Sequence, residues 1–259
     1  MDSTVTPQAL RRAICSGTYT DNTSGMAADF VQCNVVILPA ENAMDFLRFC
    51  QINPKPCPLI ALGDPDVTAL PGLGDIDICT DLPRYRVFRQ GNVTEEVTDI
   101  AALWRGDLVT FALGCLFSFE DALLADGLEV RNVSQRLNVL MYQTDIHCAD
   151  SGDLFRVKWW SACVRSTPAM PFALFKFAPG FPQCTLVHLG DPRLIGIEDL
   201  ERPDYGDAVQ IYEAEIPLFW ACGVTPQVAL AAARLPFAIT HSPGCMLITD
   251  MHNSQLAVL

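Results

Sequence analysis

The sequence predicts an α/β protein: a mixed sheet flanked by helices, with a smaller α+β portion in the middle of the chain. Three observations support this class. Strand-like apolar runs alternate with helical stretches near both ends of the chain, and the middle is rich in strands. Half of the 259 residues are hydrophobic and only 18% are charged, as in compact globular proteins. This length is enough for one large domain or two modest ones.

Local signals define the first elements. Residues 6–14 predict a helix capped by Thr6. Residues 30–39 form an apolar run that predicts a strand buried on both faces. Residues 41–52 repeat apolar side chains at helical spacing, and the prolines within residues 53–58 must end that helix.

The rest of the chain predicts a hairpin, two strand-to-helix units and a series of strands. Residues 85–88 and 93–97 flank a glycine-containing turn and predict a β-hairpin. Residues 108–115 and 217–222 each predict a strand followed by a tight turn and a capped helix. Residues 170–177 are ambiguous between helix and strand. Further strands are predicted at 139–143, 154–164, 185–189, 209–214 and 237–241.

This order of elements predicts a discontinuous main domain. The main α/β domain comprises residues 1–140 plus 205–259, and residues 141–204 form the smaller α+β portion. The chain has no internal repeat at solenoid spacing and no low-complexity tract.

The charge balance limits the partners. The chain has 30 acidic and 17 basic residues, a net charge of −13, and no cluster of Lys and Arg offsets it. Such a surface repels nucleic acid and anionic membranes, so we expect neither as a partner. The expected partner is a small, amino-acid-like substrate, and a homo-oligomer is left open.

Cysteine usage and the N-terminus suggest a cytoplasmic protein. The 11 cysteines are spread singly without a Cys-x-x-Cys pair, which favours buried reduced thiols over a disulfide framework or zinc site. The polar N-terminus lacks the apolar stretch of a signal peptide, and no apolar run is long enough to span a bilayer. No cofactor is predicted. Asp81, Asp191, Asp207 and Asp250 leave a divalent metal open, but no ligand spacing requires it.

The common catalytic motifs are absent. The chain has no Gly-x-Gly-x-x-Gly, P-loop, Gly-x-Ser-x-Gly or His-Glu-x-x-His sequence, which argues against the usual nucleotide-binding, hydrolase and zinc-protease classes. Polar residues at strand ends and turns remain as candidates. Each also has a structural interpretation: aspartates as turn formers, Ser118 and Glu120 as helix caps, and a single histidine as a hydrogen-bonded structural group.

The stretch 217–227 is the most informative of these turns. It predicts a strand, a glycine turn at Gly223 and a helix capped by Thr225 with Pro226 at its first position. The unpaired N–H groups and the dipole of a helix N-terminus favour anions. The stretch therefore predicts a carboxylate or phosphate site, with an ordinary buried connection as the alternative.

Several stretches together carry a family resemblance. They are FWACGVTPQ at 219–227, ITHSPG at 239–244, QCN at 32–34, NPKPCP at 53–58, TDLPRY at 80–85, HLGDP at 188–192 and PDYGD at 203–207. In this order they resemble the D-glutamate cyclase family, and the similarity extends from about residue 11 to about residue 250. The resemblance implies dehydration of D-glutamate to 5-oxo-D-proline on an α/β fold in two parts.

Five positions depart from the family's pattern. They are Cys79, Leu116, Cys163, Gln183 and Cys245. At these positions up to two arginines, two histidines and a serine of the family are replaced by uncharged or less polar groups. Because a dicarboxylate substrate needs cations, the departures suggest a less anionic or even cationic substrate, or a loss of activity.

Positions that match the family supply the expected catalytic residues. His241 is expected as the acid/base, with Asp250 or Asp81 orienting it or the substrate. Glu120 is expected as a second proton carrier, and Cys222 as a covalent nucleophile or as part of the pocket wall.

The same resemblance supplies the expected substrate-binding residues. They are Cys115, Ser118, Tyr142, Thr144, His188, Gly223, Thr225 and Arg84. The Cys115 thiol is a second candidate nucleophile, and the main-chain N–H groups around 117–120 and 223–227 are expected to hold oxyanions.

Three functions remain open from the sequence. The first is a hydro-lyase of the D-glutamate cyclase type. The second is a dehydratase or cyclase that acts on another amino-acid derivative in specialised metabolism. The third is a catalytically silent homologue that binds a small molecule.

Overall fold

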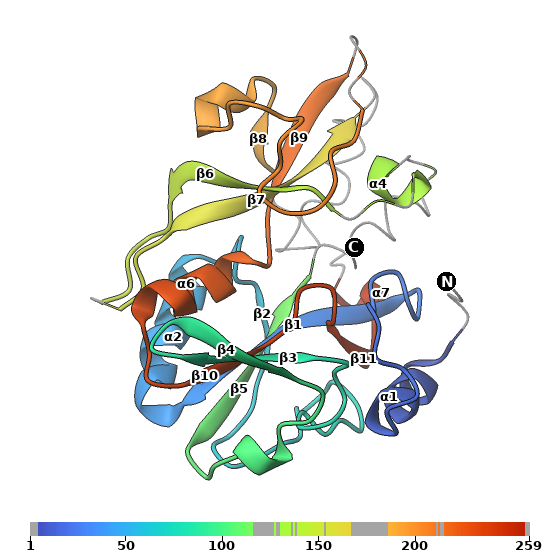
Figure 1. Ribbon diagram of the computed structural model, residues 1–259, viewed down its shortest axis with the longest axis vertical. Coiled ribbons are helices and arrows are strands. Elements are labelled where there is room, and N and C mark those ends of the chain that lie inside the picture. The colour runs from blue at the N-terminus through green and yellow to red at the C-terminus, as the bar shows by residue number, and fades with distance from the viewer. Residues whose placement is uncertain are drawn as a thin grey trace.

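The protein contains two antiparallel sheets, a large one and a small one (Figure 1). The computed structural model describes residues 5–115, 127, 130–135, 137, 139–152, 154–166, 186–210, 212 and 215–256. The large sheet contains β1 (Phe30–Pro39), β2 (Leu59–Leu62), β3 (Tyr85–Arg89), β4 (Asn92–Val97), β5 (Leu108–Gly114), β10 (Ala238–His241) and β11 (Leu247–His252). The small sheet contains β6 (Met141–His147), β7 (Lys158–Ser166), β8 (Leu186–Leu189) and β9 (Ile216–Ala221).

The α-helices are α1 (Pro7–Cys15), α2 (Ala40–Ile52), α4 (Arg131–Ser134), α6 (Thr225–Ala233) and α7 (Asn253–Leu256), and the 3-10 helices are η1 (Ala101–Leu103) and η3 (Pro192–Ile195). Helices α2 and α6 cover one face of the large sheet, α1 and α7 lie beside β11, and α4 and η3 lie beside the small sheet. The large sheet has the order β2-β5-β1-β10-β3-β4, with β11 also beside β1, and the small sheet has the order β6-β7-β9-β8.

Strand β1 organises the large sheet. One edge pairs with β5 from Cys33 to Pro39. The other edge is shared: β10 pairs at Val36 and Ile37, and β11 pairs from Phe30 to Cys33. The segment between β10 and β11 turns away from β1. On this edge, therefore, neither β10 nor β11 pairs with Asn34 or Val35. Asn34, at this break in the pairing, lines the pocket described below.

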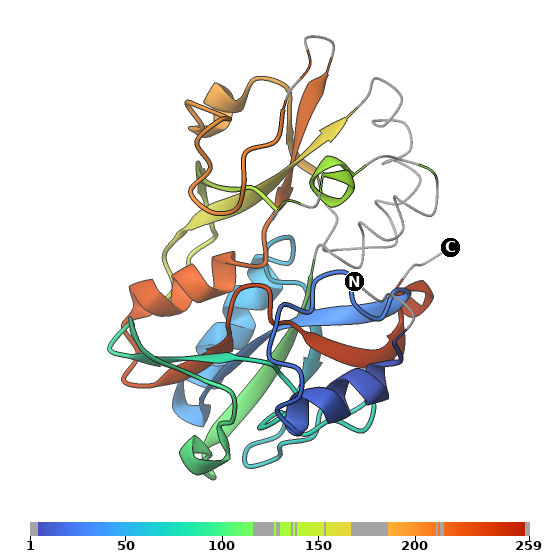
Figure 2. The ribbon, with the colours of Figure 1, turned by 45° about the vertical axis from the view of Figure 1, so that its right-hand side comes forward.

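The two faces of the large sheet are covered differently. On one face, α2 and α6 pack side chains such as Phe46 and Leu230 against the strands, and the Phe46 and Phe111 rings meet edge-on with centroids 5.0 Å apart. Figure 2 shows these two helices on the same side of the sheet. On the other face, the loop between β2 and β3 supplies buried residues such as Leu70 and Ile78. Both faces are therefore apolar, as predicted for residues 30–39.

The connection from β9 to α6 joins the two parts of the molecule. Strand β9 lies in the small sheet, whose core includes Tyr142, Ile195 and Phe219. Helix α6 follows within four residues and packs on the large sheet. The chain therefore passes from one part to the other at residues 222–224, inside the stretch with the strongest sequence signal (Figure 1).

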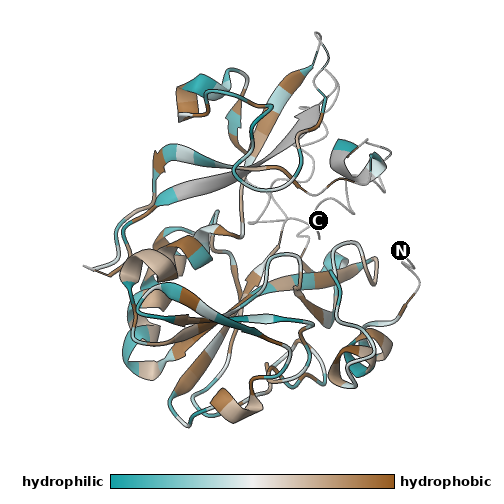
Figure 3. Cartoon of the chain, viewed as in Figure 1, coloured by the Kyte–Doolittle hydropathy of each residue, from teal (hydrophilic) through white to brown (hydrophobic). Residues whose placement is uncertain are grey.

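The edge strand β4 is the most polar strand of the large sheet. Its sequence is NVTEEV, nearly all of it exposed, and it is coloured mostly hydrophilic in Figure 3. Charged residues on an edge discourage pairing with another chain. Within the described residues, no helix is both long and apolar enough to cross a membrane.

The predicted fold class is confirmed in the sense of a sheet flanked by helices with a smaller strand-rich portion. Every ladder between named strands is antiparallel. The capped first helix is also confirmed, because Thr6 Oγ1 accepts from Ala9 N–H at 3.3 Å. The hairpin is confirmed as β3 and β4.

Three local predictions are corrected. Thr225 is the first residue of α6, and Val224, with no side-chain hydrogen bond, is its cap, because the turn at 222–224 already holds the Thr225 N–H on Cys222 O. Val209 and Gln210 do not lie in a strand: Val209 packs in the small core, and the Gln210 carbonyl accepts from Arg131. Because β9 joins the small sheet, that sheet reaches beyond the predicted limit at 204.

Some expectations fall outside the described residues. These are the capped helix after 118 and the ambiguous stretch 170–177. Strands β2 and β11 had no separate prediction. Both are short and flanked by polar turns, so each carries a weak periodic signal.

Candidate active site

A pocket of about 530 Å³ lies where the two sheets and α6 meet. Its lining residues come from β1, β3, β10 and the start of α6, and from segments 139–141 and 205–206 beside the small sheet. The polar residues among them include Asn34, Arg86, Gln227 and His241. Three of these four are almost completely buried, so the pocket places polar groups in a largely apolar setting.

Asn34 forms part of the floor, at the break in the β1 pairing. Its Nδ2 donates to the carbonyl of Gly114 at 3.0 Å. A Cβ on Gly223 would lie 2.1 Å from the same Nδ2, so only glycine permits this close approach. The glycine of the strand-to-helix turn is thus required by the asparagine it packs against.

His241 lies at the end of β10 and is held through both ring nitrogens. Nδ1 is 3.1 Å from Val35 N and 3.3 Å from Val35 O, and Nε2 is 3.4 Å from Gln227 Nε2. The Val35 N–H favours a ring proton on Nε2, whereas the Gln227 N–H favours one on Nδ1. Gln227 also donates to the His241 carbonyl at 3.2 Å, which fixes the amide beside the ring.

Burial sets the charge of His241. Loss of solvent lowers the pKa of the imidazole to about 4, the nearby Arg86 charge lowers it slightly further, and the hydrogen bond to Val35 acts in the opposite direction. The ring is therefore neutral at pH 7. A neutral imidazole can accept a proton, but it does not hold one ready to donate.

Arg86 is the one cationic side chain among the described lining residues, and none of those residues is Asp or Glu. Arg86 reaches the pocket from β3, and its Nε donates to Glu96 Oε1 at 2.7 Å. No partner within the described chain engages its two terminal nitrogens, which leaves them for an anion.

The start of α6 adds main-chain donors to the same pocket. Gly223 and Val224 line it, and their N–H groups donate to no other described residue. The N–H groups of Thr225 and Gln227 are already bonded to Cys222 O and Val224 O. Of the main-chain N–H groups predicted to bind an anion, those of Gly223 and Val224 therefore remain as donors.

Asp81 and Asp250 lie away from the pocket and share one arginine. Arg11 Nη2 lies 3.0 and 2.9 Å from the two Asp250 carboxylate oxygens, and its Nε lies 3.6 Å from Asp81 Oδ2. Arg11 also donates to the carbonyls of Ile248 and Asp75. Neither aspartate contacts His241, so the structure does not bring them together as an orienting pair.

Four predicted binding residues also lie outside the pocket lining: Tyr142, Thr144, His188 and Thr225. Tyr142 is in the small core and donates to Leu200 O at 2.6 Å. His188 Nε2 lies 2.7 Å from Asp191 O, and its ring lies tilted beside Phe219 with centroids 5.8 Å apart. Buried Thr144 bonds through its hydroxyl to the Ile146 N–H, and buried Thr225 begins α6.

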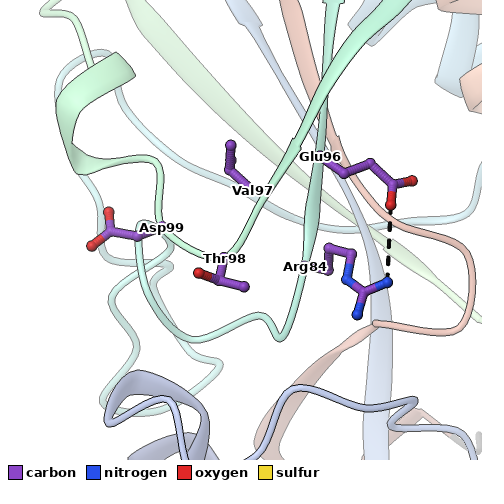
Figure 4. Close-up of a pocket in the computed structure, with 5 residues that line it drawn as sticks. All are labelled: Arg84, Glu96, Val97, Thr98 and Asp99. Carbon is purple, nitrogen blue, oxygen red and sulfur yellow. Dashed lines mark ion pairs between the residues drawn. The ribbon is translucent and has the colours of Figure 1, made fainter.

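Arg84 belongs to a separate, open hollow on the surface of β3 and β4. Figure 4 shows it facing Glu96, with an Nη1–Oε2 distance of 4.0 Å, beside Val97, Thr98 and Asp99. Because strand neighbours alternate faces, Arg84 and Arg86 share a side, but only Arg86 reaches the pocket.

Three predicted residues do line the pocket with His241: Cys115, Cys222 and Gly223. Ser118 and Glu120 lie outside the described residues. The side chains of Asn34, Arg86 and Gln227 were not predicted as part of the site. A polar asparagine inside the apolar run of β1 was an available signal, whereas nothing in the sequence distinguishes Arg86 from Arg84.

The departures from the family's pattern fall mostly elsewhere. Cys79 is buried under the large sheet, and burial raises the pKa of its thiol to about 12. Cys245 is buried in the 242–246 turn but is not among the lining residues. Cys163 belongs to β7, and Leu116 and Gln183 lie outside the described residues. No cluster of three His, Cys, Asp or Glu side chains suited to a metal ion occurs in the described part of the chain.

Comparison with known proteins identifies the family. Residues 109–250 match the family described as D-glutamate cyclase. A protein of Bradyrhizobium diazoefficiens named "Putative hydro-lyase" is 50% identical over 256 residues, which cover 98% of this chain and 94% of the relative. The chain belongs to the D-glutamate cyclase family. The resemblance read from the sequence motifs is thereby confirmed.

Other members of the D-glutamate cyclase family match at a similar level. A protein of Bordetella petrii, also named "Putative hydro-lyase", is 51% identical over 247 residues, which cover 94% of this chain and 93% of the relative. Among solved structures, a nitrogen repressor-like protein of Methanococcus jannaschii aligns with a TM-score of 0.40 and 9% identity, over 90% of this chain and 91% of the other.

Proposed function

We propose that the protein is a carbon–oxygen lyase that closes an amino acid bearing a distal carboxylate into a lactam and releases water. With D-glutamate the product is 5-oxo-D-proline. The main observation behind this proposal is the similarity to the family over nearly the whole chain. The pocket supports it, because a cation, two main-chain donors and a buried imidazole converge there.

The reaction defines what the pocket must supply. The amine nitrogen attacks the carbon of the distal carboxylate, so a C–N bond forms and a C–O bond breaks. The ammonium group loses two protons, and both leave with the departing carboxylate oxygen as water. The protein must therefore move protons and stabilise negative charge on the tetrahedral carbon's oxygen.

His241 fits the proton-moving role in this proposal. Because its imidazole is neutral at pH 7, it can take a proton from the ammonium and deliver that proton to the leaving oxygen. Gln227 holds the ring from one side and Val35 from the other. Arg86 and the N–H groups of residues 223–224 would hold the carboxylates.

A second substrate class is favoured by the charge count. D-glutamate carries two carboxylates, but Arg86 is the one cation among the described lining residues and is already paired with Glu96. An amino-acid derivative without a free second carboxylate would need less cationic compensation. This keeps open the altered substrate that the sequence departures suggested.

A direct assay tests the proposal. The full chain is incubated with D-glutamate, L-glutamate and D-glutamate α-amide, and lactam formation is followed by proton NMR. We expect lactam from a D-substrate, and a His241→Ala variant about 10²–10⁴-fold slower in kcat/KM. His252→Ala, in the exposed end of β11, is the matched control and should retain the rate.

A different outcome would favour the binding alternative. If these ligands raise the melting temperature of the protein but no lactam forms, the chain is a silent binding homologue. If His241→Ala turns over at the wild-type rate, His241 is not the proton carrier.

A further inference from the structure

Asn34 presents a buried acceptor to the pocket. Its side chain is 4% exposed and lines the cavity. Nδ2 is engaged by Gly114 O, but Oδ1 accepts a hydrogen bond from no residue in the described part of the chain. Because Asn34 lines the pocket, the acceptor that the protein leaves unpaired is available to a donor on a ligand.

The orientation of this amide is set by its neighbours. Gly114 O can only accept, so the NH₂ end must face it, and the reverse orientation would place two acceptors together. A Cβ on Gly223 would lie 2.1 Å from the same Nδ2, so glycine is required beside this NH₂ end. Oδ1 is therefore held as an acceptor at a fixed place beside residues 223–224.

A second buried asparagine shows the structural alternative. Asn53 Nδ2 donates to Phe49 O at 3.0 Å and to Ala149 O at 2.9 Å, and its Oδ1 accepts from Ala149 N at 2.7 Å. Both ends of that amide are satisfied by the main chain. Asn34 differs because only its donor end is used.

We propose that Asn34 Oδ1 accepts a hydrogen bond from the amine of the substrate, while the N–H groups of Gly223 and Val224 bind the adjacent α-carboxylate. The pocket then recognises a free α-amino acid, with its amine at the β1 floor and its distal carboxylate toward Arg86. This assignment rests on the proposed function for the identity of the amine as the nucleophile.

A neutral acceptor suits an amine that must react. A carboxylate in this place would stabilise the ammonium form and keep the lone pair protonated. An amide oxygen binds the ammonium and the neutral amine alike, so it can position the nitrogen before and after it loses its proton. The lack of Asp and Glu among the described lining residues agrees with this choice.

The test compares two ligands that differ only in the amine. Dissociation constants of D-glutamate and glutarate are measured by calorimetry on the full chain carrying His241→Ala, with and without Asn34→Ala. We expect Asn34→Ala to weaken D-glutamate at least about tenfold and glutarate less than about twofold. Gly223→Ala, which must displace the Asn34 amide beside the 223–224 donors, should weaken both ligands, and D-glutamate more than glutarate.

Two further variants separate recognition from structure. Asn53→Ala removes the fully satisfied asparagine and should lower the melting temperature without changing the ratio of the two affinities. Asn34→Asp is made in the protein that retains His241. It should keep or lower KM for D-glutamate but lower kcat. It should also move the rise of kcat to higher pH, because the added carboxylate retains the ammonium.

The outcomes distinguish this assignment from the proposed function. Equal weakening of both ligands by Asn34→Ala would mean that Asn34 only shapes the pocket, and would overturn the assignment while leaving the lyase proposal intact. Selective weakening without any turnover by the wild type would support the assignment and contradict the lyase. Failure of the protein to bind D-glutamate at all would contradict this assignment and D-glutamate as the substrate.

Discussion

At the scale of single residues, burial decides the chemistry of His241. A histidine in water titrates near pH 6.5, so its residue type alone predicts a group that both donates and accepts protons near neutral pH. In the fold, the pKa of His241 falls to about 4 because the imidazolium would lose its solvent. The residue is therefore neutral at pH 7, and the same shift makes it a weaker base than a histidine in water.

This shift predicts a pH-dependent stability. Between pH 6.5 and about 4, His241 binds a proton in the unfolded chain but not in the native protein. The contribution of neutral His241 to the free energy of unfolding is therefore fully present above pH 6.5. It is lost as the pH falls toward 4. The contribution amounts to about 3 kcal/mol. Urea unfolding of wild type and His241→Gln at pH 7.5, 6.5, 5.5 and 4.5 measures it.

As the pH falls, the unfolding free energy of the wild type should decrease more than that of His241→Gln. His188→Gln, at a half-buried site in the small sheet, is the control. A difference that stays constant from pH 7.5 to 4.5 would contradict a burial-driven shift.

At the scale of elements, α1 is fastened to β11 by Arg11. This buried arginine reaches from α1 to the carboxylate of Asp250, to the Ile248 carbonyl and to the loop that carries Asp81. Burial raises the pKa of Asp81, against the lowering effect of the Asp77 N–H and of Arg11. The cluster joins three segments, which gives these two aspartates a structural task.

Removing the arginine should therefore affect stability. Arg11→Met leaves two carboxylates and two carbonyls without their donor, and should cost about 3–5 kcal/mol of unfolding free energy. Urea denaturation measures it, with Arg12→Met on the exposed side of the same helix as control. A loss below about 1 kcal/mol would contradict the fastening role.

Elements were predicted well wherever the signal is short-range. Thr6 caps α1, and the prolines after Ile52 end α2, because each acts on the backbone within a few residues. The cap of α6 was predicted one residue late, since Cys222 O captures the Thr225 N–H in a tight turn. The stretch at 209–210 has strand-like composition but is used as a packed loop, which tertiary contacts decide.

At the scale of the whole molecule, the pocket belongs to neither sheet alone. The turn at 223–224 and strand β1 supply one side, and Val139, Met141 and Gly206 supply another. A ligand that contacts both sides should slow the opening of both, because it binds the closed native arrangement and not the separated parts.

Hydrogen exchange can test this coupling. Saturating D-glutamate should slow amide exchange both at residues 139–141 and at residues 223–227, and the α1 amides, far from the pocket lining, should be unchanged. Protection limited to one of the two segments would mean that the ligand contacts only one part of the molecule.

The sequence by itself determined the family, the principal elements and the turn that opens the pocket, because motifs, caps and hydrophobic spacing act over neighbouring residues. It also indicated Cys115, Cys222, Gly223 and His241, which line one cavity. Only the tertiary structure decided which other residues join them. Asn34, Arg86 and Gln227 meet His241 through strand register and the crossing from β9 to α6.

The same long-range packing removed Asp81 and Asp250 from the site. Their partner, Arg11, lies 70 and 239 residues away along the chain, and no local pattern specifies such a pair. Burial then turned His241 into a neutral acceptor and left Asn34 Oδ1 open to the pocket. Contacts between distant segments set the dielectric and the partners of each group, and these determine its chemistry.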